Sequence, residues 1–157
     1  ARQRGLKPIL AGRSNEGIAA IAADTGFDSL VFDLDDTAEL NRALKGISLV
    51  LHCAGPFSAT SQPMIEACLK NGCHYLDITG EISVFANAHK QSDEASHADI
   101  VLMPGVGFDV VPTDCLAARL VKALPAATAI TLAFESGSHM SPGTAKTSIE
   151  GLAGGRT

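Results

Sequence analysis

The segment YLDITGE, residues 75–81, holds the side chains best suited to acid–base chemistry. Tyr75 and Asp77 are two residues apart, so they lie on one face if the segment is a β-strand. Tyr75 could then donate a proton, Asp77 could orient a substrate amine or a water molecule, and Glu81 could pair with a cationic group. We favour the structural alternative, in which Asp77 and Thr79 hydrogen-bond to the backbone of the following loop.

The segment CAGPF, residues 53–57, combines a flexible residue with a rigid one. Gly55 has no Cβ, so the main chain there can lie against a ligand, and Pro56 fixes the path into the next segment. An ordinary turn would need the same two residue types. The segment therefore predicts a turn, with ligand contact as the functional interpretation.

The segment AGRS, residues 11–14, offers a different kind of contact. Gly12 permits a close approach, Arg13 carries a planar guanidinium and Ser14 carries a hydroxyl. After the second strand of a dinucleotide-binding fold, an acidic side chain suits the 2′-hydroxyl of NAD and a basic one suits the 2′-phosphate of NADP. Position alone leaves an ordinary surface arginine beside a helix cap equally open.

The elements that must position these residues alternate along the chain. Apolar runs predict strands at residues 7–11, 29–34, the start of 48–57, 73–78 and 99–105. Helix signals between them are an N-cap at Ser14 or Asn15 with a stop at Gly26, a capping box of Asp36 and Glu39, first-turn prolines at Pro63 and Pro112, and a polar stretch over 83–97. This order favours parallel β-α-β units, so we predict a doubly wound α/β fold.

The pattern changes after Pro125. Residues 126–136 alternate as an antiparallel strand would, and SPGT, residues 141–144, resembles the start of a helix. We therefore predict two parts: a Rossmann-like domain over 1–125, and over 126–157 the beginning of a second α+β domain for substrate binding or dimerisation.

Composition narrows the function classes. The chain of 157 residues has a net charge of −5, which argues against general nucleic-acid or anionic-membrane binding. No apolar run approaches the roughly 20 residues of a membrane span. No CxxC pair is present, so we expect free, mostly buried thiols in a reducing cytoplasm and no metal site; the cysteines are Cys53, Cys68, Cys73 and Cys115.

A Rossmann-type sheet normally opens with a strand and a glycine-rich turn that holds the pyrophosphate, and the sequence contains no GxGxxG. Residues 1–13 look instead like the end of a helix that runs into the second strand. In the order 3-2-1-4-5-6 the absent first strand is a central one, so its loss would separate the two halves of the sheet. We expect the sequence to be a segment of a longer protein.

Four motifs, ILAGRS, CAGPF, CHYLDITGE and GVGFDVVPTD, occur in this order. With them the chain resembles the saccharopine dehydrogenase-like NAD(P)-dependent oxidoreductases, whose broad relatives include the trans-acting enoyl reductases. The resemblance covers nearly the whole chain and implies an NADP site, with NAD the less favoured cofactor.

The resemblance also assigns residues to the parts of that site. It implies cofactor contacts from Gly12, Arg13 and Ser14 at the 2′-phosphate, Asp33 and Leu34 at the adenine, Cys53, Ala54, Gly55 and Pro56 at the nicotinamide half, and Phe108 beside the nicotinamide ring. Tyr75 and Asp77 are the candidates for catalysis, and Asp109 is the expected cap of the helix that Pro112 opens. The region of Thr147 and Glu150 would begin the substrate-side domain.

The expected parent protein is an NADP-dependent oxidoreductase that passes a hydride between the nicotinamide and an imine, carbonyl or enoyl substrate. The isolated segment is expected to be inactive. Two alternatives stay open: a non-catalytic, degenerate Rossmann scaffold for assembly, and an epimerase-like or sensor protein related only by fold. We expect a small-molecule substrate, no nucleic acid, no membrane span and a cytoplasmic location, and we leave a homodimer open.

Overall fold

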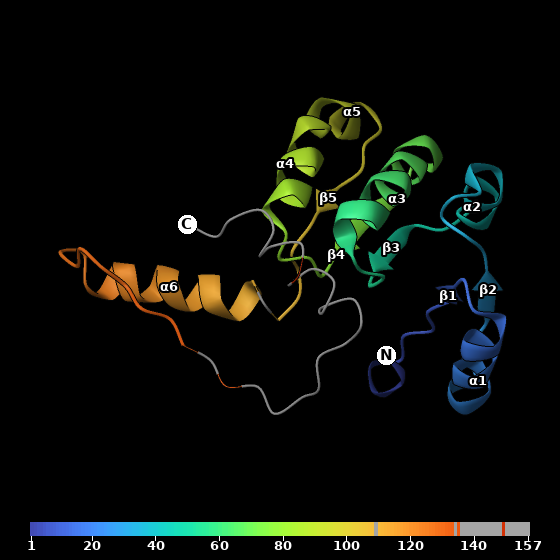
Figure 1. The fold of residues 1–157 in the computed structure, drawn as a ribbon, viewed down its shortest axis with the longest axis horizontal. Coiled ribbons are helices and arrows are strands. Elements are labelled where there is room, and N and C mark those ends of the chain that lie inside the picture. Colours follow the sequence, from blue (N-terminus) through green and yellow to red (C-terminus); the bar gives the residue numbers. More distant parts are fainter. Residues whose placement is uncertain (109, 134, 136–148, 150–157) are drawn as a thin grey trace.

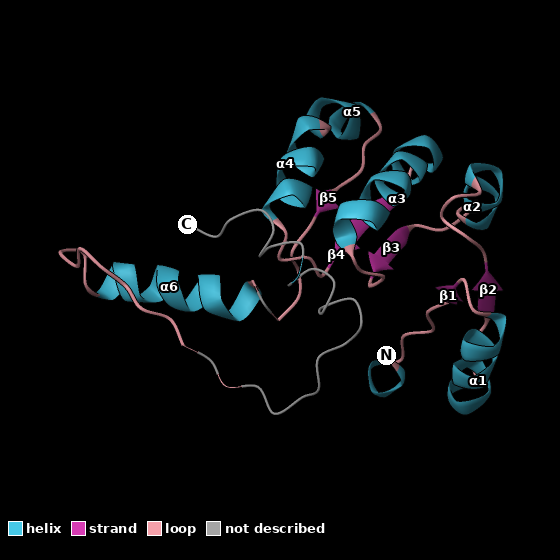
Figure 2. Ribbon diagram, in the orientation of Figure 1, coloured by secondary structure: helices cyan, strands magenta, loops and turns pink. Residues whose placement is uncertain are grey.

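The computed structural model describes residues 1–108, 110–133, 135 and 149. Figure 1 shows short strands and helices alternating from the N-terminus to α6, and Figure 2 shows the same view coloured by secondary structure. None of the helices in the described part is long and apolar enough to cross a lipid bilayer.

The first part of the chain is a small parallel β-α-β unit followed by a helix. Its elements are a 3-10 turn (Arg2–Arg4), β1 (Leu10–Gly12), α1 (Asn15–Thr25), β2 (Ser29–Val31) and α2 (Thr37–Ala43). Strands β1 and β2 are parallel, with Leu10 beside Ser29. Both strands lie where the sequence predicts them, although each is shorter than predicted.

Side-chain caps begin both of these helices, as the sequence predicts. Ser14 Oγ accepts a hydrogen bond from the Gly17 N–H at 3.1 Å, and Asp36 Oδ1 accepts one from the Glu39 N–H at 2.8 Å. Each cap satisfies an N–H group that has no acceptor within its own helix, which stabilises the helix by about 1 kcal/mol. Gly26 ends α1 in the left-handed conformation, so the predicted glycine stop is also confirmed.

The second part of the chain contains a three-stranded parallel sheet of order β3-β4-β5. Its elements are β3 (Leu49–His52), α3 (Phe57–Asn71), β4 (His74–Asp77), α4 (Ile82–Lys90), α5 (Ser92–His97) and β5 (Leu102–Met103). The polar stretch predicted as a helix over 83–97 is divided into α4 and α5, which meet at Gln91. Parallel strands joined by helices confirm the predicted α/β class.

Helix α3 begins at Phe57, and Pro63 lies inside it. The prediction that Pro63 takes a first helical position is therefore wrong. The physical reason is that a distant side chain stabilises an earlier first turn: the Glu81 carboxylate accepts hydrogen bonds from the N–H groups of Phe57 and Ser58. Gly72 ends the helix as predicted.

The hydrophobic core is built around α3, which packs against α2, α4 and β4. Ile65 and Cys68 of α3 are fully buried in one cluster with Leu40 of α2 and Tyr75 of β4. Burying a side chain of the size of isoleucine stabilises the fold by roughly 1.5–3 kcal/mol. This packing fixes the orientation of α3, and with it the turn that precedes the helix.

The strands form two separate sheets, one of β1 and β2 and one of β3, β4 and β5. Among the described residues, β1 pairs only with β2, and β3 pairs only with β4. One edge of β1 and one edge of β3 therefore lack a partner strand in this part of the chain. The division agrees with the expectation for a Rossmann-type sheet without its central first strand.

Helix α6 (Val111–Ala123) has Pro112 in its first turn, as the sequence predicts. Figure 1 shows that α6 projects away from the layers formed by the other elements, and Leu116, Leu120 and Leu124 are exposed.

Residues 126–133 form no strand, so the predicted antiparallel strand is wrong for them. A strand needs a neighbouring strand for its backbone groups, and none is present in the described part. The predictions for Asp109, Thr147, Glu150 and the SPGT helix lie outside the described residues.

Candidate functional site

The carboxyl ends of β3, β4 and β5 meet at one edge of their sheet because the strands are parallel. His52, the last residue of β3, lies beside Asp77, the last residue of β4, and Leu76 lies beside Met103 of β5. The segments that follow these strands therefore gather at this edge. In open α/β sheets, ligands bind outside the carboxyl ends of the strands.

Asp77 is fully buried at this edge and receives hydrogen bonds on both carboxylate oxygens. Tyr75 OH donates to Oδ2 at 2.7 Å, while the N–H groups of Thr79 and Gly105 donate to Oδ1 at 3.0 and 2.8 Å. The main-chain oxygen of Asp77 also accepts from the Val106 N–H at 2.8 Å. Asp77 thus fastens the loop after β5 to the end of β4.

Tyr75 and Asp77 share one strand face, as predicted, and both are fully buried. Burial, followed by the hydrogen bond and charge of Asp77, raises the pKa of the Tyr75 hydroxyl above its ordinary value. The geometry matches the structural alternative, because Asp77 accepts from the Thr79 N–H and Thr79 Oγ1 accepts from the Glu81 N–H at 3.0 Å. The acid–base role of Tyr75 and Asp77 stays a prediction.

His52 is a buried polar residue that the sequence reasoning did not include among the site residues. Its Nε2 lies 3.0 Å from Thr60 Oγ1, and its ring packs near those of Phe57 and Tyr75. Burial lowers the pKa of His52 to about 4, against the opposing effect of the Asp77 carboxylate. The ring is therefore neutral near pH 7. A histidine at the end of an apolar strand, just before a Gly-Pro turn, was the available signal.

The turn between β3 and α3 presents its main chain to solvent. Cys53, Ala54 and Gly55 are exposed, Pro56 is half-buried, and the Gly55–Pro56 peptide is cis. Thr60 Oγ1 holds the turn from inside α3 by donating to the carbonyl oxygens of Ala54 and Pro56. An exposed and fixed stretch of backbone of this kind is suited to contact a flat ligand.

All four cysteines are free thiols. Cys68 and Cys73 are buried, whereas Cys53 and Cys115 are exposed, so the expectation of mostly buried thiols holds for half of them. Among the residues that the structure describes, no three His, Cys, Asp or Glu side chains are grouped so that they could hold a metal ion.

The loop after β5 packs closely against the segment after β4. A Cβ at Gly105, where φ is +75°, would lie 2.5 Å from Phe85 Cζ, and a Cβ at Gly107 would lie 2.8 Å from Ile78 Cβ. Only glycine fits at these two positions without moving the neighbours. Phe108 follows them with 65% of its surface exposed. The loop thus presents an exposed aromatic ring next to the carboxyl edge.

The other predicted cofactor residues lie at the carboxyl edge of the β1–β2 sheet. Arg13 is exposed and has no hydrogen-bond partner among the described residues, while Ser14 caps α1. Asp33 is exposed and accepts from the Asp35 N–H at 3.1 Å. Leu34 packs against the hydrophobic core and is only partly accessible. The predicted site residues therefore fall into two groups, one on each sheet.

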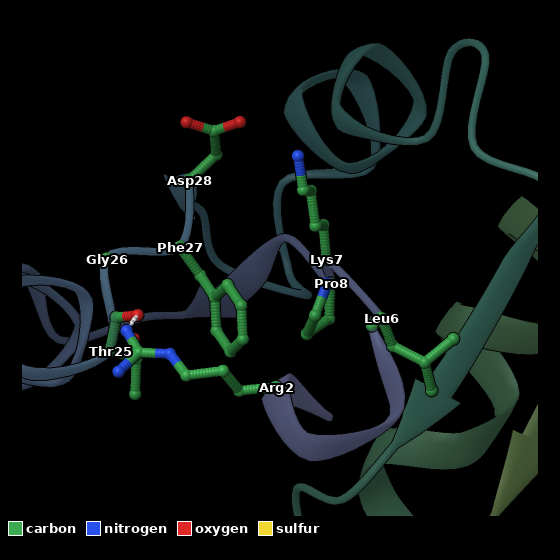
Figure 3. A pocket seen from close by; sticks show the side chains of 9 residues that line it. Arg2, Leu6, Lys7, Pro8, Thr25, Gly26, Phe27 and Asp28 are labelled. Carbon is green, nitrogen blue, oxygen red and sulfur yellow. Dashed lines mark hydrogen bonds between the residues drawn. The ribbon is translucent and has the colours of Figure 1, made fainter.

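A shallow hollow of about 440 Å³ lies at the opposite, amino ends of β1 and β2. Figure 3 shows the Arg2 guanidinium pointing at the Thr25 main-chain oxygen, to which it donates a hydrogen bond. The same guanidinium lies 6.0 Å from the centroid of the Phe27 ring. Because ligands of such sheets bind at the carboxyl ends, this hollow is separate from the candidate site.

The fold and the position of these residues define a Rossmann-type α/β domain, with its candidate ligand edge at the carboxyl ends of parallel strands. A family model described as the saccharopine dehydrogenase NADP binding domain matches residues 1–103. The chain belongs to this family, as the four sequence motifs predicted.

Two curated relatives are similar to this chain. The chain is 31% identical over 117 residues to a saccharopine dehydrogenase-like oxidoreductase of Mus musculus, with 67% of this chain and 27% of the relative covered. It is 31% identical over 122 residues to a trans-acting enoyl reductase of Mycobacterium ulcerans, with 72% and 28% covered. The chain thus spans about a quarter of the length of these relatives, one named as an oxidoreductase and the other as an enoyl reductase.

A solved structure shows the same fold. Apo saccharopine dehydrogenase (L-Glu forming) of Saccharomyces cerevisiae superposes with a TM-score of 0.64 at 17% identity. The match covers 76% of this chain and 26% of that protein. The likeness confirms the predicted fold class.

Proposed function

We propose that the chain forms two walls of the NADP site of an oxidoreductase of the saccharopine dehydrogenase type. In this proposal the β1–β2 edge binds the adenine half of the cofactor, and the β3–β4–β5 edge binds the nicotinamide half. The bound cofactor would supply the hydride, which passes between the nicotinamide and an imine, carbonyl or enoyl carbon of a small molecule. The residues described here would bind the cofactor and hold it in a fixed orientation.

The observation that carries the proposal is the exposed Arg13 at the end of β1. Its guanidinium has no partner among the described residues, and it lies directly beside the capped N-terminus of α1. A guanidinium can bind a phosphate through two parallel hydrogen bonds, and an N-terminus of a helix favours an anion. Asp33, at the end of the neighbouring strand, is exposed at the same edge and is the proposed neighbour of the adenine.

The nicotinamide wall would consist of exposed main chain and one exposed ring. Residues 53–55 present their backbone, Pro56 fixes the exit, and Phe108 offers an apolar surface. These groups can accept a flat heterocycle without a charged partner. Tyr75 and Asp77 would act mainly by holding the loops in place, because three hydrogen-bond donors already engage the buried Asp77 carboxylate.

The Arg13→Ala variant tests the assignment of the 2′-phosphate. In the full-length protein we expect NADPH affinity to fall by about tenfold to a hundredfold, since a hydrogen bond to a charged group contributes roughly 1.5–3 kcal/mol. NADH affinity should change by less than about twofold, because NADH has no 2′-phosphate. Calorimetric titration of both cofactors measures the two effects.

Arg42→Ala is the matched control, because Arg42 is an exposed arginine on α2. It should leave the affinities for both cofactors unchanged. Equal affinity of the unsubstituted protein for NADPH and NADH would contradict the role of Arg13. Failure to bind either cofactor would favour the second candidate, a non-catalytic scaffold, which the separation of the two sheets could support.

Several finer assignments belong to the same proposal. We place a domain boundary at Pro125, directly after the end of α6, with residues 126–157 beginning a substrate or dimerisation domain. A homodimer and a cytoplasmic location stay predictions. One relative, from Arabidopsis thaliana, is described as a probable mitochondrial saccharopine dehydrogenase-like oxidoreductase, so a mitochondrial location is the alternative.

A further inference from the structure

The segment after β4 contains a continuous line of hydrogen bonds. Tyr75 OH and the Thr79 N–H donate to Asp77, and the Glu81 N–H donates to Thr79 Oγ1. These four residues alternate along the chain, and we call them, together with the hydrogen bonds between them, the β4 brace. The brace begins in the buried core and ends at Glu81, which is only partly buried.

The carboxylate of Glu81 reaches out of the brace to the first turn of α3. Oε1 accepts from the Phe57 N–H at 3.0 Å, and Oε2 accepts from the Ser58 N–H at 2.7 Å. Pro56, the N-cap residue of α3, supplies no side-chain hydrogen bond of its own. The Glu81 carboxylate therefore accepts the hydrogen bonds that an N-cap side chain would otherwise accept, although Glu81 is 24 residues away from Phe57 in sequence. Its charge also complements the positive end of the helix dipole.

The position of this contact gives it a consequence for the site. Phe57 directly follows the exposed turn of residues 53–56. The hydrogen bond from the Phe57 N–H to Glu81 therefore also restricts the position of this turn. Asp77, in the same brace, holds Gly105 in the loop after β5. The brace thus sets the position of the turn after β3 relative to the loop after β5.

We propose that Glu81 is a positioning residue for the nicotinamide half of the cofactor site, acting through the backbone N–H groups of Phe57 and Ser58. The inference rests on the proposed function, because it assigns the nicotinamide half to the turn of residues 53–56. The cationic partner that the sequence suggested for Glu81 stays a prediction, and the structure gives its carboxylate these two backbone donors.

Binding of a whole cofactor and of its adenine half tests this role. In the full-length protein, Glu81→Gln should weaken NADPH binding by about tenfold, because one charge-assisted hydrogen bond is lost and the other is weakened. Glu81→Ala should weaken it further. Adenosine 2′,5′-bisphosphate carries only the adenine half, so its affinity should stay within about twofold in both variants.

Glu66→Gln provides the matched control, because it removes the same charge from an exposed glutamate on α3, the helix that the Glu81 carboxylate contacts. It should change neither affinity. An equal loss of NADPH and adenosine 2′,5′-bisphosphate binding in Glu81→Gln would show a general effect on the fold and would overturn the positioning role. Unchanged NADPH binding in Glu81→Ala would overturn it as well.

Amide hydrogen exchange separates this inference from the proposed function, because it needs no cofactor. Glu81→Gln should speed exchange at Phe57 and Ser58 by about tenfold, with no change at Leu40 of the neighbouring helix α2. Unchanged exchange at both amides would refute the role of Glu81 whatever the protein binds. If exchange responds and NADPH fails to bind the unsubstituted protein, the contact stands, while the proposed function and the positioning role both fail.

Discussion

His52 shows how a single buried ring makes stability depend on pH. Burial lowers its pKa from 6.5 to about 4 in the folded chain. The unfolded chain therefore takes up a proton on this ring at a pH where the folded chain does not, and acid favours unfolding. We expect this group to lower the free energy of unfolding by about 2 kcal/mol between about pH 7 and about pH 5.

Urea unfolding at a series of pH values measures this contribution. His52→Asn should remove most of the decrease over that range, whereas His97→Asn should not, because His97 is exposed on α5. The same pH dependence in the His52 variant and in the unsubstituted protein would show that another group is responsible.

At the residue scale, the sequence predicted which residues lie on the same face of a strand, but not which groups their side chains contact. The two-residue spacing of Tyr75 and Asp77 predicted a shared face, and the structure confirms it. The partners of Asp77 and Glu81 were not predictable, because Gly105 and Phe57 are brought close only by the packing of neighbouring strands. His52 was missed as a site residue because its place at the end of an apolar strand does not reveal that Thr60, Phe57 and Tyr75 surround its ring.

At the scale of elements, α3 carries much of the stability of the second sheet. Ile65→Ala should lower the free energy of unfolding by about 2–5 kcal/mol, because Ile65 is fully buried among side chains of α3 and its neighbours. Ile82→Ala is the control, since 84% of Ile82 is exposed, and it should change stability by less than about 0.5 kcal/mol. Chemical denaturation measures both values, and similar losses in the two variants would contradict the assigned core.

Local signals predicted the elements well wherever the stabilising contacts are local. The caps at Ser14 and Asp36 are short-range hydrogen bonds, and the structure has both. The start of α3 was mispredicted because Glu81 stabilises it from a different element. The strand predicted after Pro125 is absent over 126–133, since alternation alone supplies no partner strand.

At the scale of the whole molecule, we expect the separation of the two sheets to weaken cofactor binding by residues 1–157 alone. Arg13 lies on one sheet and the turn of residues 53–56 lies on the other, with no strand pairing between the sheets in the described part. A dinucleotide gains affinity from both halves only if both walls are held at a fixed spacing.

We therefore expect residues 1–157 alone to bind NADPH no more than about threefold more tightly than adenosine 2′,5′-bisphosphate. The full-length protein should show a preference for NADPH of about tenfold or more. Titration of each ligand against each protein measures the ratio. A strong preference for NADPH in residues 1–157 alone would show that the two sheets already form one site.

The β4 brace also has a consequence for engineering. Its side chains connect the turn after β3, the segment after β4 and the loop after β5, so these three pieces share one set of contacts. In this protein the Asp77 carboxylate is positioned to accept a hydrogen bond from the Gly105 N–H. A loop from a relative, grafted after β5, would have to place one of its own N–H groups at the same point. Chimaeras between relatives should therefore keep NADPH binding when residues 53–58, 75–81 and 104–108 are transplanted together, and lose it when any one of these segments is moved alone; titration with NADPH measures this.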